Sequence, residues 1–499
     1  MGLSGIFDPG SVMIGNLIDR VQLPNVSTLE GDDVGANAQK TRDQLVGRFA
    51  QIQESLNNRW PEDKIEPSLE RVARAVELLA DPQSSFPTIH VAGTNAKTST
   101  VRLIDQLALT LGLRTGRFTS PHLESVRERI SIAGEPIAIE RLVENFDDIA
   151  PYVEIVDAES IGQGGPAMST FEVLTVLALA SFAEAPVDAA VVEVGMGGRW
   201  DATNVIDASV SVITPIGLDH SEYLGNTLEQ IAGEKAGIIK PGGIVVVAQQ
   251  DPAVMEVIVQ RAREVGAQLI QEGVDFQVAD RQLAVGGQLI AVAGLGGLYD
   301  EIFLPLHGEH QAHNAAVALV AFESFLGGGH QRLDVSLVRE AFAQATSPGR
   351  LEIIRRSPTI LVDAAHNPHG ARATAEALRE SFDFGSIVAV LGVMQDKDVE
   401  GIVTAFADGV DVVVATAAQD PRAMPAQQVG QVCAQVLGAD RVVVVPDLID
   451  ALEAAVALAD DATNAGSESA AVVVVGSVAL AGQARALLRR ARGISGDDL

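Results

Sequence analysis

The chain of 499 residues contains one cysteine, Cys433. A single cysteine excludes a disulfide framework and a cluster of thiolate metal ligands, so we interpret Cys433 as a small core or surface residue. Aromatic residues are also few, at 4% of the chain, whereas glycines and runs rich in Ala and Val are abundant. This balance favours parallel strands covered by helices over a sandwich of aromatic hairpins.

Positive charge and long apolar segments are scarce as well. The 35 Lys and Arg residues stand against 66 Asp and Glu, and the net charge of −31 would repel a phosphate backbone or an anionic membrane. The longest nearly apolar run, 173–183, is shorter than the roughly 18 residues that span a bilayer. Residues 1–20 lack the basic and then apolar pattern of a signal peptide. We therefore expect a cytoplasmic protein without nucleic-acid or membrane partners. An anionic ligand would need a local site of backbone N–H groups, a few basic side chains and Mg²⁺.

The length predicts two or three domains, at about 100 to 200 residues each. Residues 1–38 show no clear periodicity, and we expect a loose N-terminal extension there. From Thr88 onward, short runs rich in Val and Ile alternate with helical patterns, which predicts an α/β fold with a doubly wound, mostly parallel sheet. Residues 266–304 contain Gly-Gly turns and predict a hairpin subregion. The alternation restarts after residue 348, so we predict a central domain over 39–345 and a second, smaller Rossmann-like α/β domain over 346–499.

The junction between a predicted strand, 88–92, and the helix that follows has the composition of a P-loop-type nucleotide site. In the segment 93–99, GTNAKTS, the helix N-terminus and backbone N–H groups would face a phosphate, Lys97 would neutralise it, and Thr98 or Ser99 could reach Mg²⁺. The pattern G-x-x-x-x-G-K-[ST] is not met, because Val91 and Ala96 stand where its glycines would be. The pattern alone leaves an ordinary strand-to-helix turn open.

Three further polar residues are candidates for a site. Glu193 ends an apolar strand at the edge where open α/β sheets bind ligands, and a buried carboxylate there needs a cation. We favour a metal ion over pairing with a surface lysine. Ser120 lies in a Ser-Pro sequence and His220 follows the third strand; taken alone, each is more simply a turn or loop residue.

Taken together, these segments resemble the Mur ligase superfamily, and within it the folylpolyglutamate and dihydrofolate synthases. The resemblance is collinear from about residue 65 to 482. It rests on segments 89–99, 118–123, 128–130, 189–204, 214–220, 234–238, 308–314, 349–352, 362–368, 391–398 and 476–477. The family's G-T-N-G-K has Ala96 in place of its second glycine.

The resemblance implies roles for named residues of this sequence. It implies ATP binding by Gly93, Thr94, Asn95, Ala96, Lys97, Thr98, Ser99, Asn314, Arg350 and Asp363. It implies two Mg²⁺ ions held by Ser120, Glu193, His220 and a carbamylated Lys235. It also implies folate contacts from Ser120, Pro121, His122, Arg199 and Asp201, glutamate contacts from His366 and Ser477, and catalytic roles for Lys97, Lys235, Arg350 and His366.

The activity that the resemblance implies is ATP-dependent ligation of L-glutamate to dihydropteroate and to the γ-carboxylate of folates through an acyl phosphate. The expected partners are these small molecules, and a monomer is expected. One alternative is a nucleotide-binding relative whose ligation is impaired by Ala96, since that position often takes a positive φ, which costs an L-residue about 1 to 2 kcal/mol. Another is a peptidoglycan-precursor ligase, which should carry a UDP-binding domain ahead of the loop, where the segment before Thr88 is short.

Overall fold

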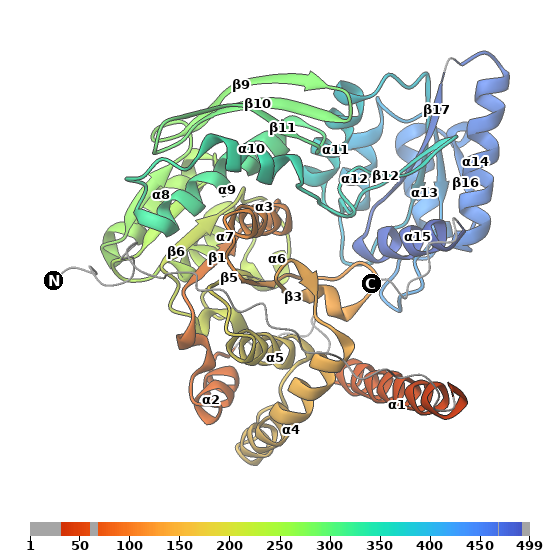
Figure 1. Cartoon of the computed structure of the whole chain (residues 1–499). Helices are drawn as coiled ribbons and strands as arrows, with labels where there is room; N and C mark the ends of the chain where they lie inside the picture. The colour runs from red at the N-terminus through yellow and green to blue at the C-terminus, as the bar shows by residue number, and fades with distance from the viewer. Residues whose placement is uncertain (1–30, 60–67, 468, 492–499) are drawn as a thin grey trace. The chain divides into compact units, whose positions relative to one another are not determined.

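The computed structural model describes residues 31–59, 68–467 and 469–491 (Figure 1). The chain divides into two compact units, residues 1–47 and 48–499. Helix α1 (Gly31–Asn57) begins in the first unit. Residues 31–38, which we expected to belong to a loose extension, form the first turns of α1, and residues 1–30 lie outside the described part. Residues 31–38 read GDDVGANA and carry no apolar repeat, so periodicity gave no signal for a helix there.

An eight-stranded sheet forms the centre of the second unit, in the order β4-β3-β2-β5-β1-β6-β7-β8. The neighbouring strands in the run β2-β5-β1-β6-β7-β8 pair in parallel, and β3 and β4 add antiparallel strands at one edge. Every residue of β1 and β5 is buried, as runs of Val, Ile and Ala in a sheet covered on both faces predict. The doubly wound, mostly parallel sheet is confirmed. The strands are β1 (Thr88–Ala92), β2 (Thr115–Phe118), β3 (Ile130–Ile132), β4 (Glu135–Pro136), β5 (Ala189–Glu193), β6 (Val210–Ile213), β7 (Ile244–Val247) and β8 (Gln268–Gln271).

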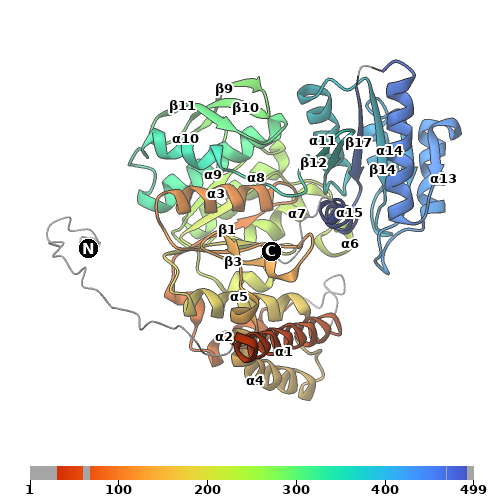
Figure 2. The same cartoon turned by 45° about the vertical axis from the view of Figure 1, so that its right-hand side comes forward.

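Helices cover both faces of this sheet. Helices α3, α9 and α10 pack together on one face and α5 lies on the other, as Figures 1 and 2 both show. The region predicted as hairpins forms a three-stranded antiparallel sheet of β9 (Gln277–Ala284), β10 (Gly287–Ala293) and β11 (Leu298–Leu304). The helices are α2 (Glu70–Leu78), α3 (Lys97–Thr110), α4 (Ile139–Gly162), α5 (Thr170–Glu184), α6 (Ser221–Leu224), α7 (Leu228–Lys235), α8 (Pro252–Val265), α9 (Glu309–Gly327) and α10 (Val335–Ala343). Among the described residues, none of the helices is long and apolar enough to cross a membrane.

A six-stranded sheet follows, in the order β12-β13-β17-β14-β15-β16. Only β12 runs antiparallel to its neighbour, and apolar clusters fill both faces, one of them containing the buried Cys433. Its strands are β12 (Glu352–Arg356), β13 (Thr359–Val362), β14 (Ser386–Leu391), β15 (Val412–Ala415), β16 (Val442–Val444) and β17 (Ala470–Val475). Its helices are α11 (Pro368–Ser381), α12 (Val399–Phe406), α13 (Ala426–Leu437), α14 (Leu448–Asn464) and α15 (Val478–Ala491). The second α/β sheet is thus confirmed. Because the two sheets lie on either side of residue 346 in the chain, we propose to keep 39–345 and 346–499 as the domain limits.

Candidate active site

Two residues in the loop between β1 and α3, Gly93 and Ala96, have positive φ angles. Gly93 has a φ of +151°, and a Cβ at this position would lie 1.8 Å from Thr214 Oγ1, so only glycine fits. Ala96 is the N-cap of α3 and adopts the left-handed conformation, with a φ of +70°. The expected positive φ at Ala96 is therefore present. Helix α3 begins at once with Lys97, which brings its N-terminal N–H groups to the loop.

The segment that follows the neighbouring strand β6 holds this loop in shape. The N–H groups of Thr94 and Asn95 donate to the carbonyl of Pro215, at 3.1 and 3.2 Å. The hydroxyl of Thr214 donates to the carbonyl of Asn95 at 2.7 Å. Lys97 Nζ donates to the carbonyl of Thr94 at 3.1 Å, so the ammonium group lies directly over the loop. A cation and a helix N-terminus thus converge where a phosphate would bind.

Glu193 ends β5 beside the loop and is only 1% exposed. Its carboxylate accepts hydrogen bonds from Thr98 Oγ1 at 3.0 Å and from the N–H of Ser120 at 3.4 Å. Burial raises the pKa of Glu193 to about 7, against the opposing effect of Lys97 and the two hydrogen bonds. A carboxylate so deeply buried is costly unless a cation lies next to it. Because β2 pairs with β5, the turn after β2 brings Ser120 and Pro121 to the same place.

Lys235 and His220 reach the site from the segments after β6. Lys235 ends α7, is 4% exposed, and donates from Nζ to the carbonyl of Gly93 at 2.8 Å. Burial and the charge of Lys97 lower the pKa of Lys235 to about 7, so a large fraction of the amine is neutral at neutral pH. His220 has a φ of +50°, and burial lowers its pKa to about 4. Its imidazole is therefore in the neutral form that binds metal ions.

The residues after 346 complete the same cleft, which has a volume of about 2600 Å³. Asp363 follows β13 and is held by Leu351 N and Ala365 N, both at 2.8 Å from its carboxylate. His366 Nδ1 contacts the carbonyl of Ala364 at 2.9 Å. The cleft brings together almost all of the predicted residues: Gly93, Thr94, Asn95, Ala96, Lys97, Thr98, Ser99, Ser120, Pro121, His122, Glu193, Asp201, His220, Lys235, Asn314, Arg350, Asp363, His366 and Ser477.

Arg199 is the exception among the predicted residues. Its side chain is exposed, does not line the cleft, and its guanidinium lies 3.4 Å from the carbonyl of Gly233. Asp201 in the same segment does line the cleft, and it accepts hydrogen bonds from the N–H groups of Met196 and Thr203, at 2.8 and 2.9 Å. Asp201 therefore shapes this wall of the cleft. His122 also lines the cleft, where burial lowers its pKa to about 3 and Arg129 Nε donates to its Nδ1 at 2.9 Å.

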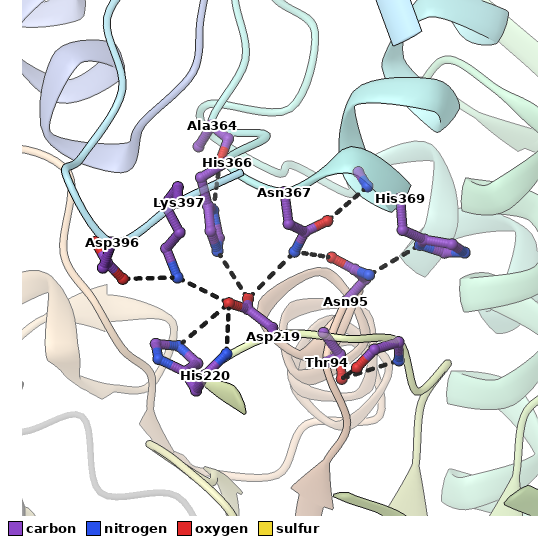
Figure 3. Close-up of polar contacts among 12 residues, drawn as sticks. Thr94, Asn95, Asp219, His220, Ala364, His366, Asn367, His369, Asp396 and Lys397 are labelled. Atoms are coloured by element: carbon purple, nitrogen blue, oxygen red, sulfur yellow. Dashed lines mark hydrogen bonds and ion pairs between the residues drawn. The ribbon is translucent and has the colours of Figure 1, made fainter. Parts of the chain in front are cut away.

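The cleft also contains a polar network that the sequence did not indicate. In Figure 3, the carboxylate of Asp219 lies between Lys397, His366 and Asn367. These three residues belong to the part of the chain after residue 346. Lys397 Nζ donates to it at 2.8 Å, Asn367 Nδ2 donates at 3.3 Å, and His366 Nε2 lies at 3.6 Å. All four residues stand in recognisable motifs. Their mutual contact joins segments that are far apart in the sequence, and the spacing of motifs carries no signal for it.

The donors at the loop fit a magnesium ion bound together with a nucleotide. The described residues contain no cluster of three or more His, Cys, Asp or Glu side chains that could hold a metal by itself. Mg²⁺ does not require one, because it commonly takes one or two carboxylates and completes its shell with phosphate oxygens and water. Glu193, with the hydroxyls of Thr98 and Ser120 nearby, matches that pattern.

Two family models match the chain. The Mur ligase middle domain covers residues 91–322, and the Mur ligase, glutamate ligase domain covers residues 349–478. The dihydrofolate synthase/folylpolyglutamate synthase of Mycobacterium tuberculosis is 50% identical over 461 residues, which are 89% of this chain and 95% of that protein. The structure of Mycobacterium tuberculosis folylpolyglutamate synthase complexed with ADP superimposes with a TM-score of 0.85 at 48% identity, over 89% of this chain and 99% of that one. The E. coli FolC structure in complex with DHPP and ADP gives a TM-score of 0.74 at 28% identity, over 89% and 98% of the two chains.

Proposed function

Because the chain belongs to the Mur ligase family, in the branch of dihydrofolate and folylpolyglutamate synthases, we propose that it is an ATP-dependent ligase that joins L-glutamate to dihydropteroate and to the γ-carboxylate of folates. The observation that carries this proposal is the single cleft in which the phosphate loop and Glu193 face Arg350 and His366. The E. coli relative has been solved with both ADP and DHPP, which supports a nucleotide and a pterin substrate for the same cleft.

ATP would lie with its phosphates on the loop 93–99. Lys97 and the N-terminus of α3 supply positive charge there, and Arg350 and Asp363 line the facing wall of the cleft. Asn314, near the start of α9, also lines the cleft, and we assign it to the adenine. This local positive charge offsets the repulsion of a nucleotide by the net charge of −31.

Two Mg²⁺ ions would be held by Ser120, Glu193, His220 and a carbamylated Lys235. When bound, Mg²⁺ stabilises the negative charge of a transferring phosphoryl group. Carbamylation requires a neutral amine, which attacks CO₂ and loses a proton. The pKa of about 7 that burial and Lys97 impose on Lys235 makes this amine available at neutral pH. The product replaces a buried cation with an oxygen ligand that suits a hard metal ion.

The reaction would proceed in two steps within the cleft. The carboxylate of the pterin substrate attacks the γ-phosphate of ATP, ADP leaves, and an acyl phosphate forms. The amino group of L-glutamate then attacks the acyl carbon, phosphate leaves, and the nitrogen loses a proton. Lys97 and Arg350 stabilise the charge that develops in both steps. His366 and Ser477 line the cleft, and we assign them to the binding of glutamate. Closure of the cleft would protect the acyl phosphate from water.

The pterin side of the cleft would be formed by Ser120, Pro121, His122 and Asp201. Arg199 has a different place in this proposal, because its side chain lies outside the cleft. We assign it to support of the loop around Asp201 through its contact with Gly233. A monomeric, cytoplasmic enzyme acting on small molecules completes the proposal.

The experiment that separates this function from the two alternatives is an ATP-consumption assay on the purified chain. One arm supplies dihydropteroate, or a reduced folate, with L-glutamate, and the other supplies a UDP-muramoyl substrate with an amino acid. We expect ATP turnover and an amide product only in the first arm. Product only in the second arm would indicate a peptidoglycan ligase, and nucleotide binding without product in either arm would indicate the impaired relative.

A further inference from the structure

The side chain of Asn367 makes hydrogen bonds both to its own helix and to two other loops. It is the N-cap of α11 and is 4% exposed. Its Oδ1 accepts a hydrogen bond from the N–H of Gly370 at 2.8 Å, which satisfies the start of the helix. Its Nδ2 donates to Asn95 Oδ1 at 3.1 Å and to Asp219 Oδ2 at 3.3 Å. One amide group therefore caps its own helix and also binds two residues in the loops that follow β1 and β6.

The two acceptors of this amide are themselves held firmly. Asp219 accepts a second hydrogen bond from Lys397 Nζ at 2.8 Å, and the two side chains are only 9% and 10% exposed. Asn95 belongs to the phosphate loop, where its N–H is bound to the carbonyl of Pro215. Figure 3 shows Asn367 between these two residues, with His366 beside it. Any displacement of Asn367 would therefore act on the phosphate loop and on Asp219 together.

We propose that Asn367 is a positioning residue for the ligation, which fixes His366 and the start of α11 over the phosphate loop by donating to Asn95 and Asp219 at once. The inference rests on the proposed glutamate ligation. Both acceptors are oxygen atoms, so the position needs a side chain with N–H donors on one atom and an acceptor for the helix on the other. Asparagine meets this requirement at this length, and aspartate meets only half of it.

The substitution Asn367→Asp separates the capping of α11 from the hydrogen bonds donated to Asn95 and Asp219. Aspartate caps a helix about as well as asparagine, so α11 keeps its N-cap. The variant loses both donated hydrogen bonds and places a carboxylate against that of Asp219. Loss of a buried hydrogen bond to a charged group, with the repulsion that follows, is expected to lower kcat about 10- to 150-fold. The KM for ATP should change less than about 3-fold, because Lys97 and the helix N-terminus remain in place.

The double variant Asn367→Asp with Asp219→Asn restores the pair with donor and acceptor exchanged, and Lys397 keeps a carboxylate nearby. We expect it to recover at least about half of the lost kcat on a logarithmic scale. Asp447→Asn is the matched control, because Asp447 caps α14 through Ile449 N and Asp450 N and does not line the cleft. Its kcat should equal that of the parent chain.

A second measurement does not depend on ligation. With ADP present, small-angle X-ray scattering should give a larger radius of gyration for Asn367→Asp than for the parent chain, and the double variant should return to the parent value. If the parent chain ligates and Asn367→Asp matches its kcat, the positioning role is wrong while the proposed function stands. If the parent chain does not ligate, the proposed function is wrong, and equal radii of gyration in parent and variant would overturn the positioning role as well.

Discussion

The backbone at Ala96 leads to a quantitative prediction for Ala96→Gly. The contacts that hold Ala96 at a φ of +70° come from the fold itself: Thr100 N donates to its carbonyl at 2.9 Å, and the adjacent carbonyl of Asn95 is bound by Thr214. A left-handed alanine costs about 1 to 2 kcal/mol relative to glycine. Glycine in turn loses about 0.5 to 1 kcal/mol more backbone entropy on folding. The variant should therefore gain about 0.5 to 1 kcal/mol in the free energy of unfolding.

Thermal unfolding measures this gain. For a domain of this size, about 1 kcal/mol shifts Tm by about 2 to 4 °C, so we expect a rise of about 1 to 4 °C. Because contacts within the protein impose this strain whether or not ATP is bound, the KM for ATP should change by less than about 3-fold. Ala133→Gly is the matched control: Ala133 also has a positive φ, of +52°, but lies in the turn between β3 and β4, outside the cleft. It should raise Tm similarly and leave the KM for ATP unchanged.

Two results would contradict the strain assigned to Ala96. A lower Tm for Ala96→Gly would show that the methyl group makes packing contacts that outweigh the strain. A parent chain that ligates no glutamate, together with a variant that does, would show that Ala96 disables the loop and would support the impaired relative.

The remaining predictions concern charged groups in the cleft. Glu193→Gln should reduce ligation at least about 100-fold with an unchanged circular dichroism spectrum, because it removes a metal ligand and almost no core volume; full activity at low Mg²⁺ would contradict the metal assignment. Lys235→Ala should lose ligation that a short carboxylate or high bicarbonate partly restores, and a silent Lys235→Arg would reject the carbamate. The hydrogen bond that His313 Nδ1 donates to the carboxylate of Glu272 raises the pKa of His313, so this pair stabilises the fold below the unfolded-state pKa and loses its contribution as the pH rises through the folded-state pKa. Glu272→Gln should therefore lower Tm more at pH 5.5 than at pH 8.5, and an equal loss at both values would contradict the charged pair.

Much of this architecture could be predicted because its signals are local. The strands of both parallel sheets are buried on both faces, and they appear as short runs of Val, Ile and Ala between helical segments. Polar residues at their carboxyl ends, such as Glu193, indicated the edge of the sheet where the cleft lies. The positive φ of Ala96 followed from its place before the lysine of a phosphate loop.

The parts that escaped prediction depend on contacts between distant segments. The start of α1 at Gly31 carries no apolar repeat, so periodicity could not detect it. Asp219 and Lys397 are 178 residues apart, and neither motif indicates that the two side chains meet. The side chain of Arg199 lies outside the cleft because it turns toward the carbonyl of Gly233, a direction that sequence neighbours do not determine.

Mass spectrometry of the reaction product shows whether this cleft ligates glutamate. The purified chain is incubated with ATP, Mg²⁺, L-glutamate and dihydropteroate, and ADP is measured in the same samples. We expect a product heavier than dihydropteroate by one glutamyl residue, formed in equal amounts with ADP and absent from Glu193→Gln. ADP release without any glutamylated product, or a product that Glu193→Gln forms equally well, would contradict ligation by this cleft.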